Sequence, residues 1–571
     1  MLKIPYGQSY FKGLIEDGFF YQDRTEYIRM IEDYDSRFLF FLRPRRFGKS
    51  LFVSMLHHYY GLEHQSNFQK LFGHLAIGQR PTPLANQMLV LLFEFSRINT
   101  DTPESTFQGF YHAVATAVRD FLGNYAVYFD SHQQKEILSQ REPSEILRQL
   151  FSFHKLNKVP LPIYILIDEY DHFANELISF NFSFFTDSVS KNGFVRKFYE
   201  TIKTATFDGV VKRLFVTGVS PITLDSLTSG FNISTNLSLD QQFHDMMGFT
   251  EAEVSKILQK IVVPETQLTA TLNDLRSWYD GYLFNAHAKH LYNPDMVLYF
   301  AQKYQIYKTY PDLLLDINIA SDYGKIKRLF RIQNREEDNL ETLRALSETG
   351  EVKAELTAQY SFEKVFSKSD LISLLFYMGF LTIKTKNLSN YTFQFPNYVI
   401  EKLYAEYFIS MIQDKANLPV DSSPINRAIL EMAETGNPQL FFDQVSLILK
   451  TLSTRDAVHF HEGSLKAIFI SLLHHQQFYY IHSEFETERK YVDVFLEAIK
   501  GYKPACEAAF ELKYLKKKDS KSIKTAMAEA EIQLKDYLMT KKFVPRETIK
   551  GFIVVVKGNV LHWRETKNLN P

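Results

Sequence analysis

The stretch of sequence that decides the fold lies at residues 37–61 and reads RFLFFL-RPRRFGKS-LFVSMLHHYY-G. Its apolar start, residues 37–42, predicts a buried strand, and apolar stripes at helical spacing over residues 51–60 predict a helix that ends at Gly61. A strand, a loop closing on Gly-Lys-Ser and a helix form the context that a phosphate-binding P-loop requires. The helix N-terminus offers free backbone N–H groups and the positive end of the helix dipole to an anion.

Within this loop we predict nucleotide contacts from Arg46, Gly48, Lys49 and Ser50. The Lys49 ammonium would reach the β- and γ-phosphates of ATP, and the Ser50 hydroxyl would ligate Mg²⁺. The usual pattern opens with glycine, whereas Arg43 stands at that position here. Two other interpretations therefore stay open. One is a strand–turn–helix junction with a cation at its tip, and the other is a loop whose arginines themselves hold phosphate or line a nucleic-acid path.

Two further apolar runs end in residues suited to nucleotide chemistry. YILI at residues 164–167 precedes Asp168 and Glu169, the Walker B arrangement, in which Asp168 would hold Mg²⁺ through water and Glu169 would polarise the attacking water. The run at residues 213–216 precedes Thr217, where an ATPase of the additional-strand class places a polar sensor for the γ-phosphate. Acids after an apolar run occur by chance, but two motifs in this order and spacing strengthen each other.

The pattern along the chain predicts an α/β protein in three parts. Residues 1–235 alternate apolar runs with helical stretches, which indicates a parallel sheet covered on both faces, as in a P-loop domain. Residues 236–455 show helical periodicity, beginning with a capping box formed by Thr250 and Glu253. Residues 456–571 predict a helix, three strands, a second helix and a further strand, the order of a restriction-endonuclease-like domain.

The C-terminal strands carry a second candidate site. Asp493 lies within one predicted strand, and Glu511 and Lys513 share a face of the next, so strand pairing can bring Asp493 beside them. Two carboxylates can hold Mg²⁺ to activate water, with Glu484 as a third acid and Lys513 positioning the nucleophile. The alternative is a solvated Glu-x-Lys face with a weak ion pair.

Composition excludes several classes of protein. The 571 residues are 45% hydrophobic and 23% charged, which is ordinary globular usage. The net charge of -1 gives no sign of nucleic acid, so a basic surface would have to be local. Cys506 has no cysteine to pair with, and the start of the chain lacks a signal peptide's apolar core. We expect a cytoplasmic protein without a membrane segment, in which residues 371–383 form a buried helix rather than a spanning one.

Two other features have competing interpretations. The segment from Lys513 to Lys524 contains six lysines, counting both ends. They could neutralise DNA phosphates, or the segment could be an exposed turn leading into a helix. The adjacent pairs His57-His58 and His474-His475 lie on predicted helices, where neighbouring side chains point about 100° apart. We therefore expect neither pair to form a metal site.

Motifs spread over nearly the whole chain resemble the AAA-ATPase-like family of prokaryotic proteins, whose members normally lack the first P-loop glycine. They are the N-terminal Lys3-Ile4-Pro5, Gly7, Phe11, Tyr21, Asp23 and Thr25, then RPRRFGKSLF, IDEYD, TGVSPITL, Ser229-Gly230-Phe231-Asn232, WYDGYLF, Tyr292-Asn293-Pro294 and Phe395-Pro396-Asn397. The family commonly carries a C-terminal PD-(D/E)xK nuclease-like domain. Relatives often show Gly-Arg shortly before the nuclease Asp, whereas this chain has Lys490-Tyr491.

The resemblance implies an ATP-binding protein, an expected ATPase, that controls a Mg²⁺-dependent DNA nuclease on the same chain. A role in defence or mobile-element biology is implied by family analogy alone. A homo-oligomer is possible, in which Arg196 or Arg213 of a neighbour completes the ATP site. Two alternatives remain: a nucleotide-dependent switch whose nuclease-like domain only binds nucleic acid or a partner, and an interaction scaffold whose P-loop binds phosphate without turnover.

Overall fold

The computed structural model describes residues 1–566, apart from several gaps. The gaps are 181, 190–191, 223–232, 312–313, 315–341, 343–344, 347–348, 359, 361–365, 417–422, 452–460, 477, 488–489, 500–501, 503, 541–542 and 544–548. Two compact units form within the chain: Met1–Glu336 with Lys353–Asn397, and Glu337–Val352 with Tyr398–Pro571. No helix of the described residues combines the length and hydrophobicity needed to cross a bilayer.

A five-stranded parallel sheet forms the centre of the first unit, in the order β2-β3-β4-β1-β5. The strands are β1 (Phe38–Leu42), β2 (Leu89–Glu94), β3 (Ile163–Asp168), β4 (Val211–Gly218) and β5 (Thr235–Asn236). Strand β4 lies between β1, which leads into the Gly-Lys-Ser loop, and β3, which ends in the acids. This inserted strand is the arrangement that the additional-strand class requires. The carboxyl ends of β1, β3 and β4 meet at one edge of the sheet, where ligands bind in such folds.

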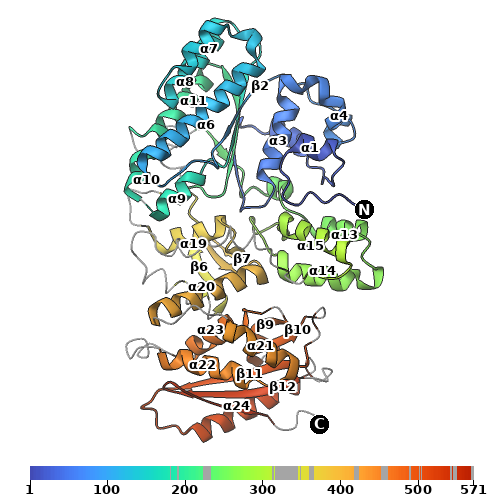
Figure 1. The fold of residues 1–571 in the computed structure, drawn as a ribbon, viewed down its shortest axis with the longest axis vertical. Coiled ribbons are helices and arrows are strands. Elements are labelled where there is room, and N and C mark those ends of the chain that lie inside the picture. Colours follow the sequence, from blue (N-terminus) through green and yellow to red (C-terminus); the bar gives the residue numbers. More distant parts are fainter. Residues whose placement is uncertain are drawn as a thin grey trace. The chain divides into compact units, whose positions relative to one another are not determined.

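Helices cover both faces of this sheet, as the sequence predicts. Figure 1 shows α6, α8 and α11 on one side and α3 with α1 and α4 on the other. The helices up to β5 are α1 (Phe11–Glu16), α2 (Glu26–Asp33), α3 (Lys49–Tyr60), α4 (Phe68–Phe72), α5 (Ala76–Gln79), α6 (Pro103–Asn124), α7 (Ser131–Leu138), α8 (Pro143–Leu156), α9 (His172–Phe180), α10 (Phe182–Val189) and α11 (Phe194–Phe207), with 3-10 turns η1 (Leu62–Asn67) and η2 (Ala126–Tyr128).

The middle of the chain is mainly helical but includes a small sheet that the sequence did not indicate. Its elements in the first unit are η3 (Gln241–Met246), α13 (Glu251–Lys260), α14 (Glu265–Tyr279), α15 (Pro294–Tyr307) and α19 (Lys368–Tyr377), and the sheet has the order β6-β8-β7, with β6 (Glu351–Glu355), β7 (Thr382–Asn387) and β8 (Asn390–Gln394). The Thr250–Glu253 capping box is confirmed at the start of α13. Helix α19 is buried over Leu371–Tyr377, and β7 begins where the predicted helix was expected to continue.

The second unit contains a mixed five-stranded sheet in the order β13-β12-β11-β10-β9, in which β11 and β12 are parallel and the other pairs antiparallel. Its elements are α20 (Tyr398–Ala416), α21 (Ser423–Thr435), α22 (Gln439–Thr451), α23 (Glu462–Leu473), β9 (Tyr479–Thr487), β10 (Lys490–Ala498), β11 (Glu507–Leu515), α24 (Ile523–Leu538), β12 (Ile549–Lys557) and β13 (Val560–Glu565). The predicted order of helix, three strands, helix and strand is present, and β13 extends it.

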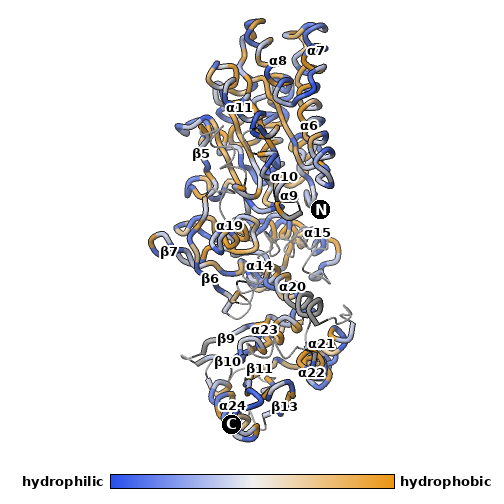
Figure 2. Tube along the Cα trace, turned by 90° about the vertical axis from the view of Figure 1, so that its left-hand side faces the viewer, coloured by the Kyte–Doolittle hydropathy of each residue, from blue (hydrophilic) through white to orange (hydrophobic). Residues whose placement is uncertain are grey.

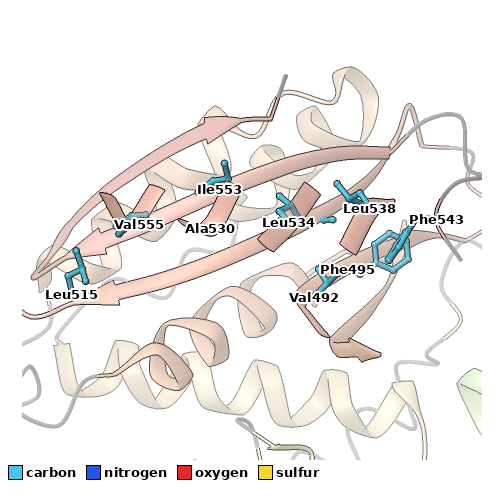
Figure 3. Packing of buried hydrophobic residues seen from close by; sticks show 11 residues of the cluster. Val492, Phe495, Leu515, Ala530, Leu534, Leu538, Phe543, Ile553 and Val555 are labelled. Atoms are coloured by element: carbon cyan, nitrogen blue, oxygen red, sulfur yellow. The ribbon is translucent and has the colours of Figure 1, made fainter. Parts of the chain in front are cut away.

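Helices pack on both faces of this sheet, and α22 joins them through Phe442, which contacts Phe510, Phe552 and Trp563. Helix α24 packs on one face through Ala530, Leu534 and Leu538 against β10, β11 and β12, as Figure 3 shows. Helix α23 is largely hydrophobic after its first turn (Figure 2), is buried from Leu465 to Leu473, and contacts β9, β10 and β11. Along β11, Ala509 and Leu515 belong to the cluster under α24. Because side chains alternate along a strand, Glu511 and Lys513 belong to this same face.

Candidate functional site

The Gly-Lys-Ser loop joins β1 to α3 with the backbone that a P-loop needs. Gly48 has a φ of 89°, a left-handed conformation that favours glycine. Lys49 follows as the first residue of α3, and its buried ammonium donates a hydrogen bond of 2.9 Å to the Pro44 carbonyl across the loop. Burial lowers the pKa of Lys49, while the charges of Glu169 and Asp168 act in the opposite direction. The lysine is thus held against the loop beside two carboxylates.

The Walker B acids meet this loop at the edge of the sheet. Asp168 is 6% exposed, and the Ser50 hydroxyl is hydrogen-bonded to its carboxylate. Burial, assisted by the charge of Glu169, raises the pKa of Asp168 to about 6, against the opposing effects of Ser50 and Lys49. The structure therefore brings Lys49, Ser50 and Asp168 together. A hydroxyl and a carboxylate in contact are oxygen donors of the kind that Mg²⁺ prefers.

Glu169 is positioned differently from Asp168. It has a φ of 50°, and its Oε2 lies 3.3 Å from His172 Nδ1 at the start of α9. Burial alone would raise the pKa of Glu169, but the His172 hydrogen bond and nearby cations, first among them Lys49, lower it to about 2. Glu169 is therefore ionised at neutral pH. The sequence analysis missed His172. The one local sign of its role is that it lies three residues after Glu169.

Thr217 lies near the end of β4 at the same edge of the sheet, where its carbonyl accepts a hydrogen bond of 3.1 Å from the Tyr170 N–H. It is fully buried, and its hydroxyl donates a hydrogen bond of 2.9 Å to the Phe41 carbonyl of β1. The hydroxyl is therefore already used within the sheet. The sensor role of Thr217 stays a prediction that this hydrogen bond does not favour.

Arg43, the residue in place of the first glycine, is turned into the protein. It is 1% exposed, and its guanidinium donates to the carbonyls of Ser238 at 2.7 Å and His244 at 3.2 Å. It also lies 4.3 Å from the ring centre of Phe41 and 4.1 Å from that of Phe284. The suggestion that Arg43 itself holds phosphate is wrong, because the side chain anchors the loop to the segment after β5.

Arg46 and the start of α15 form another wall of the site. Arg46 has a φ of 68°, and its Nη1 lies 3.7 Å from Oδ2 of Asp295 in the first turn of α15. Asn293 caps α15 and donates a hydrogen bond of 3.4 Å to the Arg45 carbonyl. The Asn-Pro motif of residues 293–294 therefore contacts the P-loop directly.

A cavity of about 430 Å³ opens beside the loop and is lined by five segments far apart in the sequence, one of which carries Glu169 and His172. The loop residues Arg45–Phe52 face lining residues between Pro5 and Arg24, residues 246–249 and the start of α15. Arg24 joins two of these walls, since its guanidinium bonds the Glu253 carboxylate and the Gly248 carbonyl at 2.7 Å. The apolar members of the lining, of a kind that fits a flat base, are Leu14, Phe20, Tyr21, Met246, Met247, Phe249 and Leu298.

The second candidate site lies on the face of the C-terminal sheet that α24 covers. Val494 pairs with Phe510 across β10 and β11, so the next residues along, Asp493 and Glu511, are neighbours. The Asp493 Oδ2 accepts a hydrogen bond of 2.8 Å from the Leu512 backbone N–H. Lys513 Nζ lies 2.9 Å from Glu511 Oε1. The structure therefore brings Asp493, Glu511 and Lys513 together.

Glu511 has the environment of a metal ligand. It is 2% exposed, and among the described residues its Oε2 has no hydrogen-bond partner. Burial and the neighbouring charge of Asp493 raise the pKa of Glu511 to about 7, despite the opposing charge of Lys513. A buried carboxylate with an unpartnered oxygen beside a second carboxylate fits a divalent cation, which would supply the missing charge and contacts. The nearby charges of Glu511 and Asp493 also raise the pKa of Tyr537, after the larger effect of burial.

Two further acids belong to other elements of this domain. Glu484 belongs to β9, between Ser483 and Phe485, which pair with Val494 and Val492 on either side of Asp493. Glu462, in the first turn of α23, lies with its Oε1 3.7 Å from Lys513 Nζ. The sequence reasoning missed Glu462. The sequence feature that could have indicated Glu462 is its position at the start of the helix before the first strand of this domain.

Two family models match separate parts of the chain. Residues 5–228 match the family described as predicted AAA-ATPase, AAA-ATPase-like, and residues 460–565 match the PD-(D/E)XK nuclease superfamily. The chain carries an AAA-ATPase-like domain and a PD-(D/E)XK nuclease superfamily domain. All predicted site residues fall within these two matches, and the P-loop without its first glycine lies inside the AAA-ATPase-like domain.

Two individual proteins were also similar. The "Uncharacterized protein in vnfD 5'region" of Azotobacter chroococcum mcd 1 is 28% identical over 310 residues, which are 53% of this chain. The match covers 52%, about half, of that relative's length. A Walker-type ATPase of Pyrococcus abyssi superposes with a TM-score of 0.37 at 11% identity, over 71% of this chain and 98% of the other.

The arginines considered for a subunit contact have partners within this chain. Arg213 is 7% exposed on β4 of the AAA-ATPase-like domain, where its guanidinium donates to the carbonyls of Ile31 at 3.4 Å and Glu32 at 3.3 Å. Arg196 pairs with Glu200 on α11 at 2.9 Å. Arg213 as a donor to a neighbouring subunit is therefore wrong, because it is buried against the end of α2.

Proposed function

We propose that this protein binds and hydrolyses ATP and uses that cycle to control a Mg²⁺-dependent DNA nuclease on the same chain. The observation that carries the proposal is the pairing of Asp493 with Glu511 beside Lys513 on one sheet face. Its support is the AAA-ATPase-like domain in the same chain, where Ser50 is hydrogen-bonded to Asp168 and the charge of the neighbouring Lys49 acts on that carboxylate. By family analogy alone, the proposal extends to defence or mobile-element biology in the cytoplasm.

In the ATPase site each group has a distinct task. Lys49 exchanges its bond to the Pro44 carbonyl for phosphate oxygens, while the backbone N–H groups at the start of α3 surround the phosphate chain. Ser50 and Asp168 would hold Mg²⁺, which neutralises charge on the phosphates when bound. Glu169, ionised and oriented by His172, accepts a hydrogen bond from the attacking water and aligns it with the γ-phosphate. The apolar part of the cavity receives the base.

In the nuclease site the carboxylates and the lysine divide the work of phosphodiester hydrolysis. Asp493 and Glu511 would hold Mg²⁺, which activates water and stabilises negative charge on the phosphate when bound, and Glu484 is a third proposed ligand. Lys513 orients the attacking water. The new bond joins water oxygen to phosphorus, the bond to the leaving sugar oxygen breaks, and that oxygen takes up a proton. Lys516, Lys517, Lys518, Lys521 and Lys524 are exposed, as contact with DNA phosphates requires.

The first test is DNA cleavage by the full chain. We expect purified protein to cut circular duplex or single-stranded DNA when Mg²⁺ is present, and to change its rate when ATP is added. A gel assay with and without each component measures both effects, and EDTA supplies the metal-free control. Cleavage that is independent of ATP would remove the proposed control but keep the nuclease. No cleavage of either substrate would favour the switch in which the nuclease-like domain only binds.

The nuclease should also depend on pH through Glu511. Its pKa is raised to about 7, and a metal ion must displace the proton from that carboxylate before it can bind. We therefore expect Mn²⁺ or Mg²⁺ affinity to fall by up to about tenfold for each pH unit below 7, and to level off above pH 8. Metal titrations of the full chain at pH 6, 7 and 8 measure this. In Glu511→Gln the remaining affinity should lose this pH dependence, and an unchanged profile would contradict the assignment.

A further inference from the structure

Three histidines gather at the C-terminal end of α3, away from the P-loop end of the same helix. His57 and His58 lie in its last turn, and His64 lies in the following turn η1. Each offers a ring nitrogen, and these nitrogens all lie within 4.8 Å of one another. The His58 and His64 rings are stacked, with centres 4.2 Å apart. Adjacent histidines on a helix do not form a metal site alone, but the chain reversal at Gly61 adds the third ligand that the sequence did not reveal.

The hydrogen bonds of His58 fix which of its nitrogens is free. Its Nδ1 lies 2.7 Å from the Ser54 carbonyl, which can only accept, so Nδ1 carries the proton. In the neutral ring the lone pair then belongs to Nε2. His58 is 2% exposed, and in the described part of the chain neither its Nε2 nor that of His64 has a hydrogen-bond partner. Leaving two buried nitrogens unpaired costs free energy that a bound ion would recover.

The other ring nitrogen of His58 is also used in a way that suits a metal ligand. A bond from the opposite ring nitrogen to a backbone carbonyl, as His58 makes with Ser54, is the usual support for a metal-bound histidine.

Glu63 supplies an oxygen at the same place. Its Oε1 lies 2.8 Å from His57 Nε2 and 3.6 Å from His64 Nε2. Its Oε2 accepts a hydrogen bond of 2.5 Å from the Tyr125 hydroxyl, which in turn accepts from the Val90 N–H at 2.8 Å. The carboxylate is thus oriented from β2. A side chain at position 61 would meet it, since a Cβ on Gly61 would lie 2.6 Å from Glu63 Oε2.

We propose that His57, His58, His64 and Glu63 form a structural zinc site that ties the end of α3 to η1. Three imidazoles and one carboxylate fill the four positions of tetrahedral Zn²⁺, whereas Mg²⁺ prefers an all-oxygen set. Ligand atoms around a zinc ion with bonds of about 2.0–2.1 Å lie about 3.3 Å apart, so binding draws the rings together from their present spacing. A cation there also interacts favourably with the C-terminal end of the α3 dipole.

The test is metal binding by the full chain, freed of any affinity tag, in buffer with excess Mg²⁺ so that the oxygen-rich sites are occupied. We expect one Zn²⁺ per chain after dialysis, measured by elemental mass spectrometry. Co²⁺ in its place should give the intense visible absorption of a tetrahedral ion. His64→Gln, at a partly exposed position, should lower Zn²⁺ affinity by at least about 100-fold in a competition titration with a chromogenic chelator.

Two controls make the result decisive. His132→Gln changes an exposed histidine of α7, which is 89% exposed, and should bind Zn²⁺ as the parent does. Glu63→Gln keeps the shape of the fourth ligand but should weaken binding. Absence of stoichiometric Zn²⁺ in the parent chain, or equal affinity in His64→Gln and His132→Gln, would overturn the proposal. Cleavage and ATP binding are not used as readouts, so failure here is distinct from failure of the proposed function.

Discussion

Replacing Asp493 by asparagine is expected to lower the rate of DNA cleavage by at least about 100-fold. The variant keeps the shape of the side chain and an oxygen that can still accept the hydrogen bond from the Leu512 N–H. It loses the negative charge that, with Glu511, would hold the metal. A single-turnover cleavage assay with Mg²⁺ on circular duplex and single-stranded DNA measures the effect.

Further measurements separate a loss of charge in Asp493→Asn from a folding defect. The charge of Asp493 helps to raise the pKa of Glu511, so Asp493→Asn should lower that pKa. Asp536→Asn, an exposed change on α24, is the matched control and should cleave like the parent. Full cleavage by Asp493→Asn would remove this residue from the catalytic site. Loss of cleavage together with a lower melting temperature would show a folding defect instead.

Replacing Lys49 by alanine is expected to weaken ATP binding by about 10- to 150-fold, the range set by one charge-assisted hydrogen bond of about 1.5–3 kcal/mol. Lys49 lies close enough to Asp168 and Glu169 for its charge to act on the pKa of both carboxylates. Without it, the negative phosphates meet two carboxylates with less compensation. Isothermal titration with ATP and Mg²⁺ measures the affinity.

The matched control for Lys49 is Lys70→Ala, which removes an exposed lysine that pairs with Glu16 at 2.8 Å. Its ATP affinity should equal that of the parent chain. Unchanged affinity in Lys49→Ala would contradict the nucleotide site, whereas the DNA cleavage assay on the same variant addresses a separate question. If ATP controls the nuclease, Lys49→Ala should show the cleavage rate of the parent without ATP.

The local features of both sites could be predicted because each depends on a short pattern. Strands β1, β3 and β4 follow from continuous apolar runs, and the polar residues after them reach the same sheet edge because the strands are parallel. The pairing of Glu511 with Lys513 follows from the two-residue repeat of a strand. In each case the decisive residues are close in sequence to the element that positions them.

The missing features depend on contacts between distant segments. The cavity beside Lys49 is lined by Arg24 and by the start of α15, and no local pattern indicates that these meet. In the sequence, Arg43 suggests a free cation beside the phosphate. The residues that bury it, however, lie about 200 positions further along the chain. Strand β13 was missed since its side chains are mostly exposed or half-buried, which leaves a weak apolar pattern.

The burial of Arg43 has a consequence for how the ATPase domain can change shape. Its bonds to the Ser238 and His244 carbonyls tie the end of β1 to the segment after β5. We therefore expect any movement driven by a nucleotide to begin after Pro44, where Arg46 faces Asp295 and the Arg45 carbonyl accepts from Asn293. Both contacts lead into α15. We expect a change in the loop to be transmitted to this helix, and α15 is therefore the place to attach a distance probe.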